Sequence, residues 1–201
     1  MCVRYFVDYS PELQPIIEAM NRSPLVSRFP QGTAVLPQGE IRPANAAPVI
    51  ATSRSGRRAV FPMKWGFTGK TLLINARTET AARKPTFREA WASHRCIVPA
   101  SWYYEWEHLP AGGGKTKTGD KYMLRPRNGA VAWMCGLYRL EEGLPCYVIL
   151  TREPGEEIRF IHDRMPLMLP EQYLEDWIRP GGNPEEIIRA AQTDMVFEKT
   201  V

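Results

Sequence analysis

The sequence contains little cysteine and lacks the cysteine and histidine spacings that mark a metal site. Its 201 residues include four Cys and three His, with no C-x-x-C pair, so we expect neither a metal nor another cofactor. No apolar run reaches the roughly 18 residues of a membrane-spanning helix. We therefore expect no membrane contact, a cytosolic location and reduced thiols. Three cysteines stand in apolar runs and are expected in the core: Cys96, Cys135 and Cys146.

Internal repeats, heptad runs and a linker-like segment are also absent from the sequence. Many short strand-like runs, interspersed with a few helical patterns and without regular alternation, favour an α+β fold. We expect a single domain over residues 1–201. Its sheet should be curved, mostly antiparallel and barrel-like, with short flanking helices.

Hydrophobic periodicity and breaker residues give the expected elements. Strands are expected at residues 3–7, 48–52, 58–62, 72–75, 96–98, 102–106, 122–125, 131–140, 147–151 and 166–169. Helices are expected at residues 11–22, 86–94, 154–161, 170–178 and 184–192. We expect strands 96–98 and 102–106 to pair with each other, and residues 111–120 to form a flexible loop.

The net charge of +4 is modest, but it is unevenly distributed. Residues 54–95 hold ten Lys or Arg against two acids, with aromatic residues between them, whereas residues 141–201 hold thirteen acids against six bases. Basic and aromatic side chains together suit a phosphate backbone with stacked bases. A solvated basic surface, balanced by the acidic segment, explains the charge equally well. We expect four tryptophans in the core: Trp65, Trp91, Trp102 and Trp133.

Cys2 directly follows the initiator methionine. A residue as small as cysteine at this position normally permits removal of Met1, which leaves an amine and a thiol on one residue. The reference pKa of such an amine is about 7.7–8.0 and that of a thiol about 8.5, and a neighbouring base or cation can raise the thiolate fraction. The amine condenses with an aldehyde, and the thiol can then close a five-membered thiazolidine ring.

Three further segments accompany the Met-Cys start. NARTET occupies residues 75–80 after an apolar run, RCIVPASWYYEW occupies residues 95–106, and IHDRMPLML occupies residues 161–169. With these segments in this order, the sequence resembles the SOS response-associated peptidase (SRAP) family, also described as abasic-site processing proteins. The resemblance runs from Met1 to about Leu169.

The resemblance implies covalent attachment to abasic sites in single-stranded DNA. Cys2 matches the nucleophile, joined to the opened sugar through its amine and sulfur. Asn75 matches the residue that positions the amine and the sugar, and Arg77 matches one that holds a phosphate. Glu105 matches the carboxylate beside the nucleophile, and His162 matches the histidine that moves protons.

The same resemblance suggests that Arg4 contacts a phosphate and that Trp106 forms a wall of the pocket. It implies a single-turnover, lyase-like reaction by a protein that associates with the nucleoid on damaged DNA. We expect the protein to be a monomer.

Proton transfer is needed because an abasic sugar is mostly a closed hemiacetal, and because water must later leave the carbinolamine. A carboxyl group among aromatic residues has a raised pKa, which suits Glu105 to general-acid work. A histidine that titrates near neutral pH, as expected of His162, can transfer a proton in either direction.

The sequence departs from the family pattern at two places. The usual Met-Cys-Gly-Arg start has Val3 in place of glycine, and the stiffer side chain restricts how the terminus can meet a sugar. The usual Asn-Ala-Pro segment has a shifted spacing, so Arg42 and Asn45 are left without an assigned role.

Two other functions remain open. An N-terminal-nucleophile cysteine peptidase or amidase, with self-processing, would use the Cys2 thiol against a carbonyl and its own amine as base. A non-covalent binder of modified or single-stranded DNA would use the basic segment without Cys2 chemistry.

Overall fold

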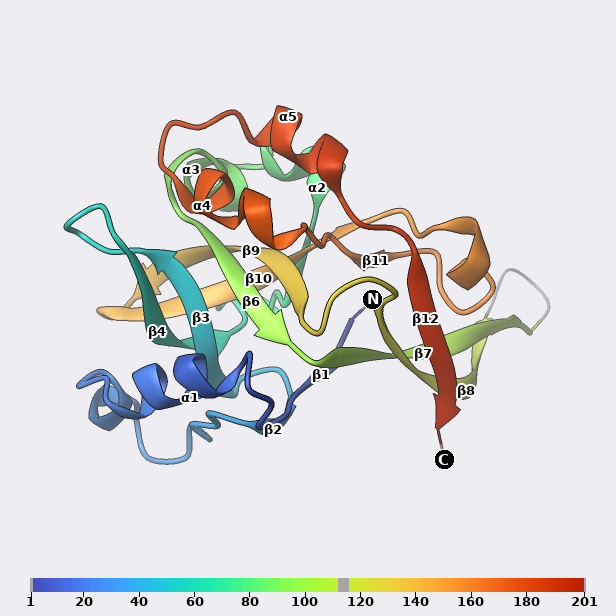
Figure 1. The fold of residues 1–201 in the computed structure, drawn as a ribbon, viewed down its shortest axis with the longest axis horizontal. Helices are drawn as coiled ribbons and strands as arrows, with labels where there is room; N and C mark the ends of the chain where they lie inside the picture. Colours follow the sequence, from blue (N-terminus) through green and yellow to red (C-terminus); the bar gives the residue numbers. More distant parts are fainter. Residues whose placement is uncertain (1, 112–115, 201) are drawn as a thin grey trace.

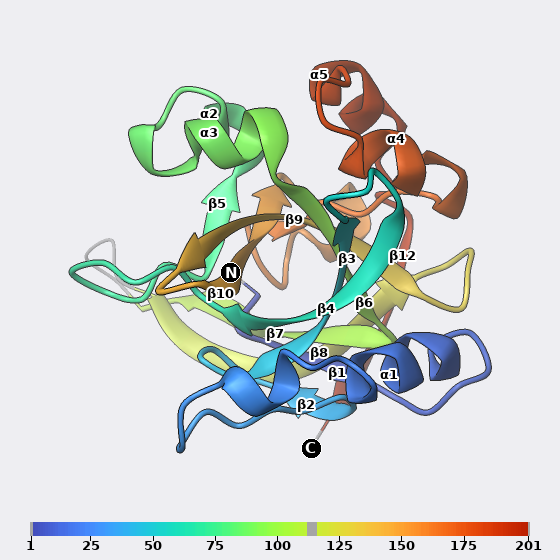
Figure 2. The same ribbon diagram turned by 90° about the vertical axis from the view of Figure 1, so that its left-hand side faces the viewer.

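The structure is a computed structural model that describes residues 2–111 and 116–200. Its strands form two sheets with short helices beside them (Figure 1), which confirms the predicted α+β class; the second sheet was not predicted. The first sheet follows the order β11-β10-β4-β3-β6-β9, and β9 pairs again with β10. That additional pairing closes a barrel, seen nearly end-on in Figure 2, and confirms the expected curved and mostly antiparallel sheet. The barrel strands are β3 (Ala46–Thr52), β4 (Arg58–Trp65), β6 (Arg95–Ala100), β9 (Ala132–Glu141) and β10 (Leu144–Arg152).

Two short strands extend the barrel sheet beside β10. β5 (Asn75–Arg77) pairs with it in parallel, and β11 (Met165–Pro166) pairs with it antiparallel. The NARTET and HDRMP segments therefore lie close together at one edge of the barrel, although they are far apart in the sequence.

The second sheet is antiparallel, with the order β12-β8-β7-β1-β2. Its strands are β1 (Arg4–Val7), β2 (Gly39–Ile41), β7 (Trp102–Pro110), β8 (Thr116–Pro126) and β12 (Met195–Thr200). β1 lies between β2 and β7, with Arg4 opposite Tyr104. Alternation along β7 turns Tyr103 and Glu105 to the buried face and Tyr104 and Trp106 to the other.

Aromatic side chains join β1 to the barrel. The Tyr5 and Tyr147 hydroxyls lie 2.5 Å apart in a buried hydrogen bond, and the Tyr5 ring packs on Trp65 at 5.2 Å. The Trp65 indole N–H donates to the Ile74 carbonyl at 2.9 Å, immediately before Asn75. This chain of contacts ties the start of β1 to the strand that carries the NARTET residues.

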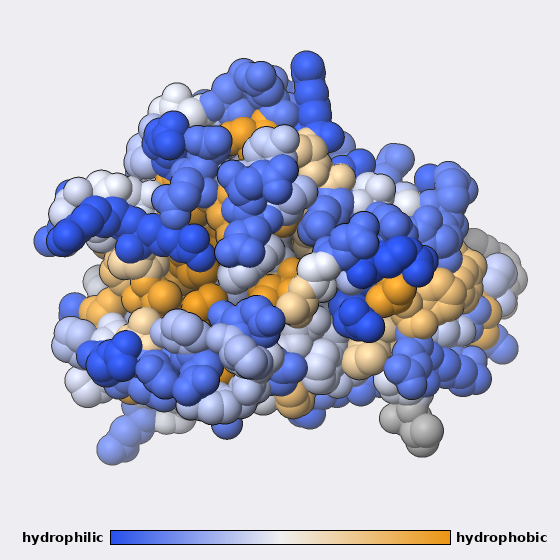
Figure 3. Space-filling model, in the orientation of Figure 1, coloured by the Kyte–Doolittle hydropathy of each residue, from blue (hydrophilic) through white to orange (hydrophobic). Residues whose placement is uncertain are grey.

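Short helices cover the barrel from two sides (Figures 1 and 2). They are α1 (Gln14–Asn21), α2 (Thr78–Ala81), α3 (Pro85–Ser93), α4 (Leu174–Ile178) and α5 (Pro184–Ile187). Single 3-10 turns lie at Val26–Arg28, Glu156–Ile158, Glu171–Tyr173 and Ile188–Ala190. Apolar surface gathers in a hollow between these elements in Figure 3. Within the described ranges, no helix has the length and apolar character that a membrane crossing requires.

Several local predictions were wrong. Strands 96–98 and 102–106 do not pair, because β6 belongs to the barrel and β7 to the second sheet. The strand expected at 72–75 begins only at Asn75, and the helix expected at 154–161 is a single 3-10 turn. Residues 116–120 of the expected loop belong to β8, and residues 112–115 lie outside the described residues. The α2 helix and β12 were not predicted.

Burial agrees with the expected core. The Cys96, Cys135 and Cys146 side chains are buried free thiols, and Trp65, Trp91 and Trp133 are buried too. Trp102 is half-buried and stacks on Phe6, with ring centroids 4.6 Å apart.

Trp65 and Trp102 provide a matched test of how much the Trp65 hydrogen bond contributes to the free energy of unfolding. Trp65→Phe removes the N–H that donates to Ile74, and we expect a loss of about 1–3 kcal/mol in the free energy of unfolding. The buried Trp102 indole nitrogen has no hydrogen-bond partner among the described residues, so Trp102→Phe should cost less than about 1 kcal/mol. Urea denaturation measures both; equal losses would contradict the assigned role of the Trp65 hydrogen bond.

Candidate active site

Cys2 lies inside the protein, two residues before the start of β1. Its side chain has no exposed surface. The Asn75 amide Nδ2 donates a hydrogen bond of 2.9 Å to the Cys2 carbonyl oxygen, so the NARTET strand holds the backbone of the nucleophile candidate. The Asn75 Oδ1 atom is buried and accepts no hydrogen bond from the described residues. An acceptor is therefore available beside Cys2.

The Cys2 thiol is not activated as a thiolate. Burial raises its pKa well above the ordinary value, and the negative charge of Glu105 raises it further. The Sγ atom makes a long contact of 3.6 Å to the Arg4 carbonyl oxygen. Burial is the largest cause, so the thiol is kept protonated near neutral pH.

Glu105 faces the interior from β7. It is 4% exposed, and burial raises the pKa of its carboxyl to about 7. The nearby Asp163 carboxylate adds to this increase, while the Trp106 backbone N–H opposes it by donating to Oε1 at 3.4 Å. The predicted shift is confirmed: this carboxyl group exchanges its proton near neutral pH.

His162 lies in the loop between the 3-10 turn at Glu156–Ile158 and β11. The register of β7 shifts between Trp106 and His108, and there the His108 backbone N–H donates to the Ile161 carbonyl at 3.0 Å. This hydrogen bond holds the loop against the strand that carries Glu105. It also brings the His108 and His162 rings to a centroid distance of 4.0 Å.

The His162 ring has a lowered pKa. Burial is the largest cause, and the neighbouring His108 and Arg164 contribute, so that the pKa falls to about 4. The ring is therefore neutral at pH 7, in contrast to the expected titration near neutrality. Nδ1 accepts the Arg164 backbone N–H at 3.0 Å, yet it also lies 2.8 Å from Asp163 Oδ1. Because the neutral ring is favoured, we interpret Nδ1 as the acceptor for Arg164, which leaves the proton on Nε2.

An ion pair between the buried Arg164 and the exposed Glu79 fixes the loop behind His162. Two nitrogens of the Arg164 guanidinium donate to the two Glu79 carboxylate oxygens, each at 2.9 Å. Arg164 also donates to the Thr151 carbonyl at 2.6 Å, and the Thr78 hydroxyl donates to the same oxygen at 2.8 Å. Although burial opposes it, this pairing lowers the pKa of Glu79. The NARTET and HDRMP segments are thus joined by the ion pair between Glu79 and Arg164.

The proposed DNA-contacting residues separate into two places. Arg77 is exposed on β5, two residues after Asn75 on the same side of the strand, and its guanidinium has no ion pair with another described residue. Arg4 lies over the Trp106 ring, 5.2 Å from its centroid, and 3.5 Å from Glu40. Trp106 therefore points to the face of β7 opposite Glu105.

One pocket lies beside the site and does not contain it. Its volume is about 760 Å³, and it begins at Thr78 and Glu79 and continues past Arg83, Arg152 and Arg189. Cys2 does not line this pocket. The chemistry-bearing groups are held in packed surroundings. The adjoining pocket carries three arginines together with three acidic residues, Glu79, Glu153 and Glu185.

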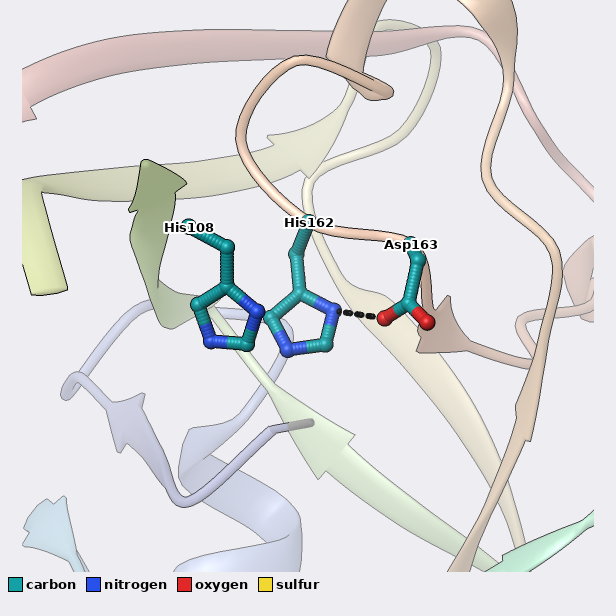
Figure 4. Close-up of side chains that lie close together, drawn as sticks. All are labelled: His108, His162 and Asp163. Atoms are coloured by element: carbon teal, nitrogen blue, oxygen red, sulfur yellow. Dashed lines mark ion pairs between the residues drawn. The ribbon is translucent and has the colours of Figure 1, made fainter. Parts of the chain in front are cut away.

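Sequence reasoning missed four residues around His162. Glu79 belongs to the NARTET segment and Arg164 to the IHDRMPLML segment, so their ion pair could have been predicted from the sequence. His108 and Asp163 also frame the ring: nitrogen and oxygen atoms of His108, His162 and Asp163 lie within 4.8 Å of one another (Figure 4). Only the fold reveals this group, because His108 and His162 come from separate segments without a metal-type spacing.

Comparison with known proteins agrees with this geometry. The family model described as SOS response associated peptidase (SRAP) matches residues 1–199. The abasic site processing protein YoqW of Bacillus subtilis is 32% identical over 94% of this chain and 85% of its own. YobE of the same organism, also an abasic site processing protein, is 33% identical over 89% of this chain and 83% of its own.

Solved structures show the same fold. A phage-related protein from Bordetella bronchiseptica superposes with a TM-score of 0.73 at 24% identity, covering 99% of this chain and 94% of its own. A protein from Bacteroides thetaiotaomicron gives a TM-score of 0.72 at 21% identity, covering 100% and 92%. Because the family model spans nearly the whole sequence, the chain belongs to the SRAP family.

Proposed function

We propose that this protein processes abasic sites in DNA, and that it does so by crosslinking Cys2 to the lesion in single-stranded DNA. One observation carries the proposal: Asn75 holds the Cys2 carbonyl at 2.9 Å in a buried site that also contains a carboxyl with a pKa of about 7. The relatives named as abasic site processing proteins support the same lesion. Removal of Met1, which lies outside the described residues, supplies the free amine.

The reaction begins with the amine, because the Cys2 thiol is kept protonated. The neutral amine adds to the aldehyde carbon C1′ of the opened sugar and forms a carbinolamine, which loses water to give an imine. The sulfur then bonds to the same carbon while the thiol proton passes to the nitrogen. The product is a thiazolidine, and one water is released for each crosslink.

Glu105 and His162 divide the proton transfers. A protonated Glu105 donates to the departing hydroxyl of the carbinolamine, since its raised pKa keeps the proton available near pH 7. The neutral His162 ring offers its Nε2–H toward the sugar oxygen and helps to open the hemiacetal. The free Asn75 Oδ1 accepts a hydrogen bond from the amine and orients it.

DNA contacts follow from the exposed charges. Arg77 binds a phosphate next to the lesion, while Arg4 and the Trp106 ring bind the strand from the other face of β7. The reaction is a single-turnover, lyase-like event on a monomer in the cytosol, at damaged sites of the nucleoid. The high thiol pKa disfavours the peptidase alternative, which needs a reactive thiolate.

Cys2 can be tested by separating imine formation from ring closure. Wild-type protein should form a heat-stable adduct with an abasic oligonucleotide and none with an intact one. Its intact mass should equal Met1-processed protein plus oligonucleotide minus one water. Cys2→Ala retains an amine but no sulfur, so we expect an imine that borohydride traps but that heating destroys. Cys135→Ala, which changes a buried thiol in β9, is the control; a heat-stable adduct of Cys2→Ala at wild-type yield would exclude the thiazolidine.

The raised pKa of Glu105 predicts how the crosslinking rate depends on pH. The rate should rise as the amine loses its proton and should fall above about pH 7, where Glu105 loses the proton that it donates. Glu105→Gln should lower the rate by about 100-fold or more and remove the alkaline decrease. Single-turnover rates between pH 5 and 9 measure both effects. An unchanged alkaline decrease in Glu105→Gln would assign it to another group.

Glu79 is expected to act as a positioning residue through Arg164. Glu79→Gln removes the charge that fixes Arg164 and the adjacent His162 loop, and the crosslinking rate should fall by up to about 100-fold. Affinity for a lesion-free strand, measured by fluorescence anisotropy, should remain within about twofold. Glu89→Gln, an exposed change on α3, should alter neither quantity. A wild-type rate for Glu79→Gln would show that the ion pair does not position His162.

A further inference from the structure

We infer that His108, His162 and Asp163 form a binding site for a divalent transition-metal ion of the zinc class. The three residues come from β7, just after its register shift, and from the loop before β11. Ligand atoms of all three lie within 4.8 Å of one another, which is close enough for one ion to contact all of them after small side-chain rotations.

The backbone already holds these two segments together. The hydrogen bond from His108 N–H to the Ile161 carbonyl, at 3.0 Å, fixes the distance between the strand and the loop. The imidazole rings are inclined at 50° with centroids 4.0 Å apart, and Asp163 lies on the far side of the His162 ring in Figure 4. Because the backbones are held in place, an ion needs to order only side chains.

The donor set selects the ion. Two imidazole nitrogens and one carboxylate oxygen suit Zn²⁺ or Co²⁺, whereas Mg²⁺ and Ca²⁺ prefer oxygen ligands throughout. Three protein ligands leave a further position for water. His108 and Asp163 are exposed while His162 is buried, so the ion can enter and leave from solvent.

The local charges favour a cation. Nδ1 of His162 lies 2.8 Å from an Asp163 carboxylate oxygen, so a nitrogen and a negatively charged oxygen already lie beside each other. A cation bound by both atoms would replace the hydrogen bond that Nδ1 accepts from the Arg164 backbone N–H. The positive charge of Arg164 is offset by its two hydrogen bonds to Glu79.

Binding of a metal ion at this site would affect the crosslinking reaction, an expectation that rests on the proposed function. An ion bound to His162 removes this imidazole from proton transfer, and the crosslinking reaction should be inhibited. The chelated ion would therefore act as a reversible inhibitor of the site.

Binding can be measured without DNA. Chelator-treated protein is titrated with Co²⁺, and we expect visible absorption bands that saturate at one equivalent and disappear on addition of Zn²⁺. His108→Ala should weaken Co²⁺ binding by more than about tenfold. His94→Ala is the matched control, since the protein has three histidines and His94 packs on Tyr138 in another part of the fold. Absence of saturable binding, or equal binding by His108→Ala, would overturn the site.

The Cys2 thiol must be excluded as the ligand. Cys2→Ala should bind Co²⁺ as tightly as wild type and show no loss of near-ultraviolet thiolate-to-metal absorption. A strong thiolate band in wild type that is lost in Cys2→Ala would overturn the assignment to the histidines.

Inhibition by the bound metal ion is tested by measuring the rate of crosslinking to an abasic oligonucleotide. Zn²⁺ at a saturating concentration should lower the rate for wild-type protein at least about tenfold, with recovery on addition of EDTA. His108→Ala should be insensitive to the same concentration. If Co²⁺ binds at His108 but Zn²⁺ leaves the rate unchanged, the site stands and the inhibition is overturned. If no crosslink forms even without metal, the proposed function fails while the absorbance result still decides the site.

Discussion

The structure depends on the burial of β1 at the contact between the barrel and the second sheet. The Tyr5–Tyr147 hydrogen bond and the packing of Tyr5 on Trp65 hold this strand from the barrel side, and pairing with β2 and β7 holds it within its own sheet. Cys2 comes two residues before the start of this strand. Its position is therefore set by core packing, so a reactive group at the end of the chain is held as firmly as a residue in the middle of a strand.

Burial acts in opposite directions on the two proton-transferring residues. It raises the pKa of Glu105 to about 7 and lowers that of His162 to about 4, because a charged form is disfavoured in both cases. At pH 7 the His162 ring is therefore neutral and about half of the Glu105 carboxyl groups are protonated, so both residues can donate a proton. The charged pair of Glu79 and Arg164 is kept behind them, where it fixes the loop and takes no part in proton exchange.

The sequence predicted the fold class and brought together the segments of the site, but it did not predict their mutual orientation. The aromatic neighbours of Glu105 in the sequence were sufficient to expect its raised pKa, but alternation along β7 turns Trp106 to the opposite face. The non-pairing of β6 and β7 could not be foreseen, because neither local propensity nor spacing says which sheet a strand joins. His108 and Asp163 escaped notice for the same reason: their proximity to His162 comes from one backbone hydrogen bond across the register shift in β7.

The complete burial of Cys2 has a practical consequence for handling the protein. Affinity tags and fusion partners are commonly attached in front of the first residue, and here an addition left in place would occupy the amine of Cys2, a residue with no exposed surface. The other end of the chain leaves from β12, an edge strand of the second sheet, where an appended sequence can extend without crossing the core. Recombinant protein should therefore carry its affinity tag at the carboxyl end.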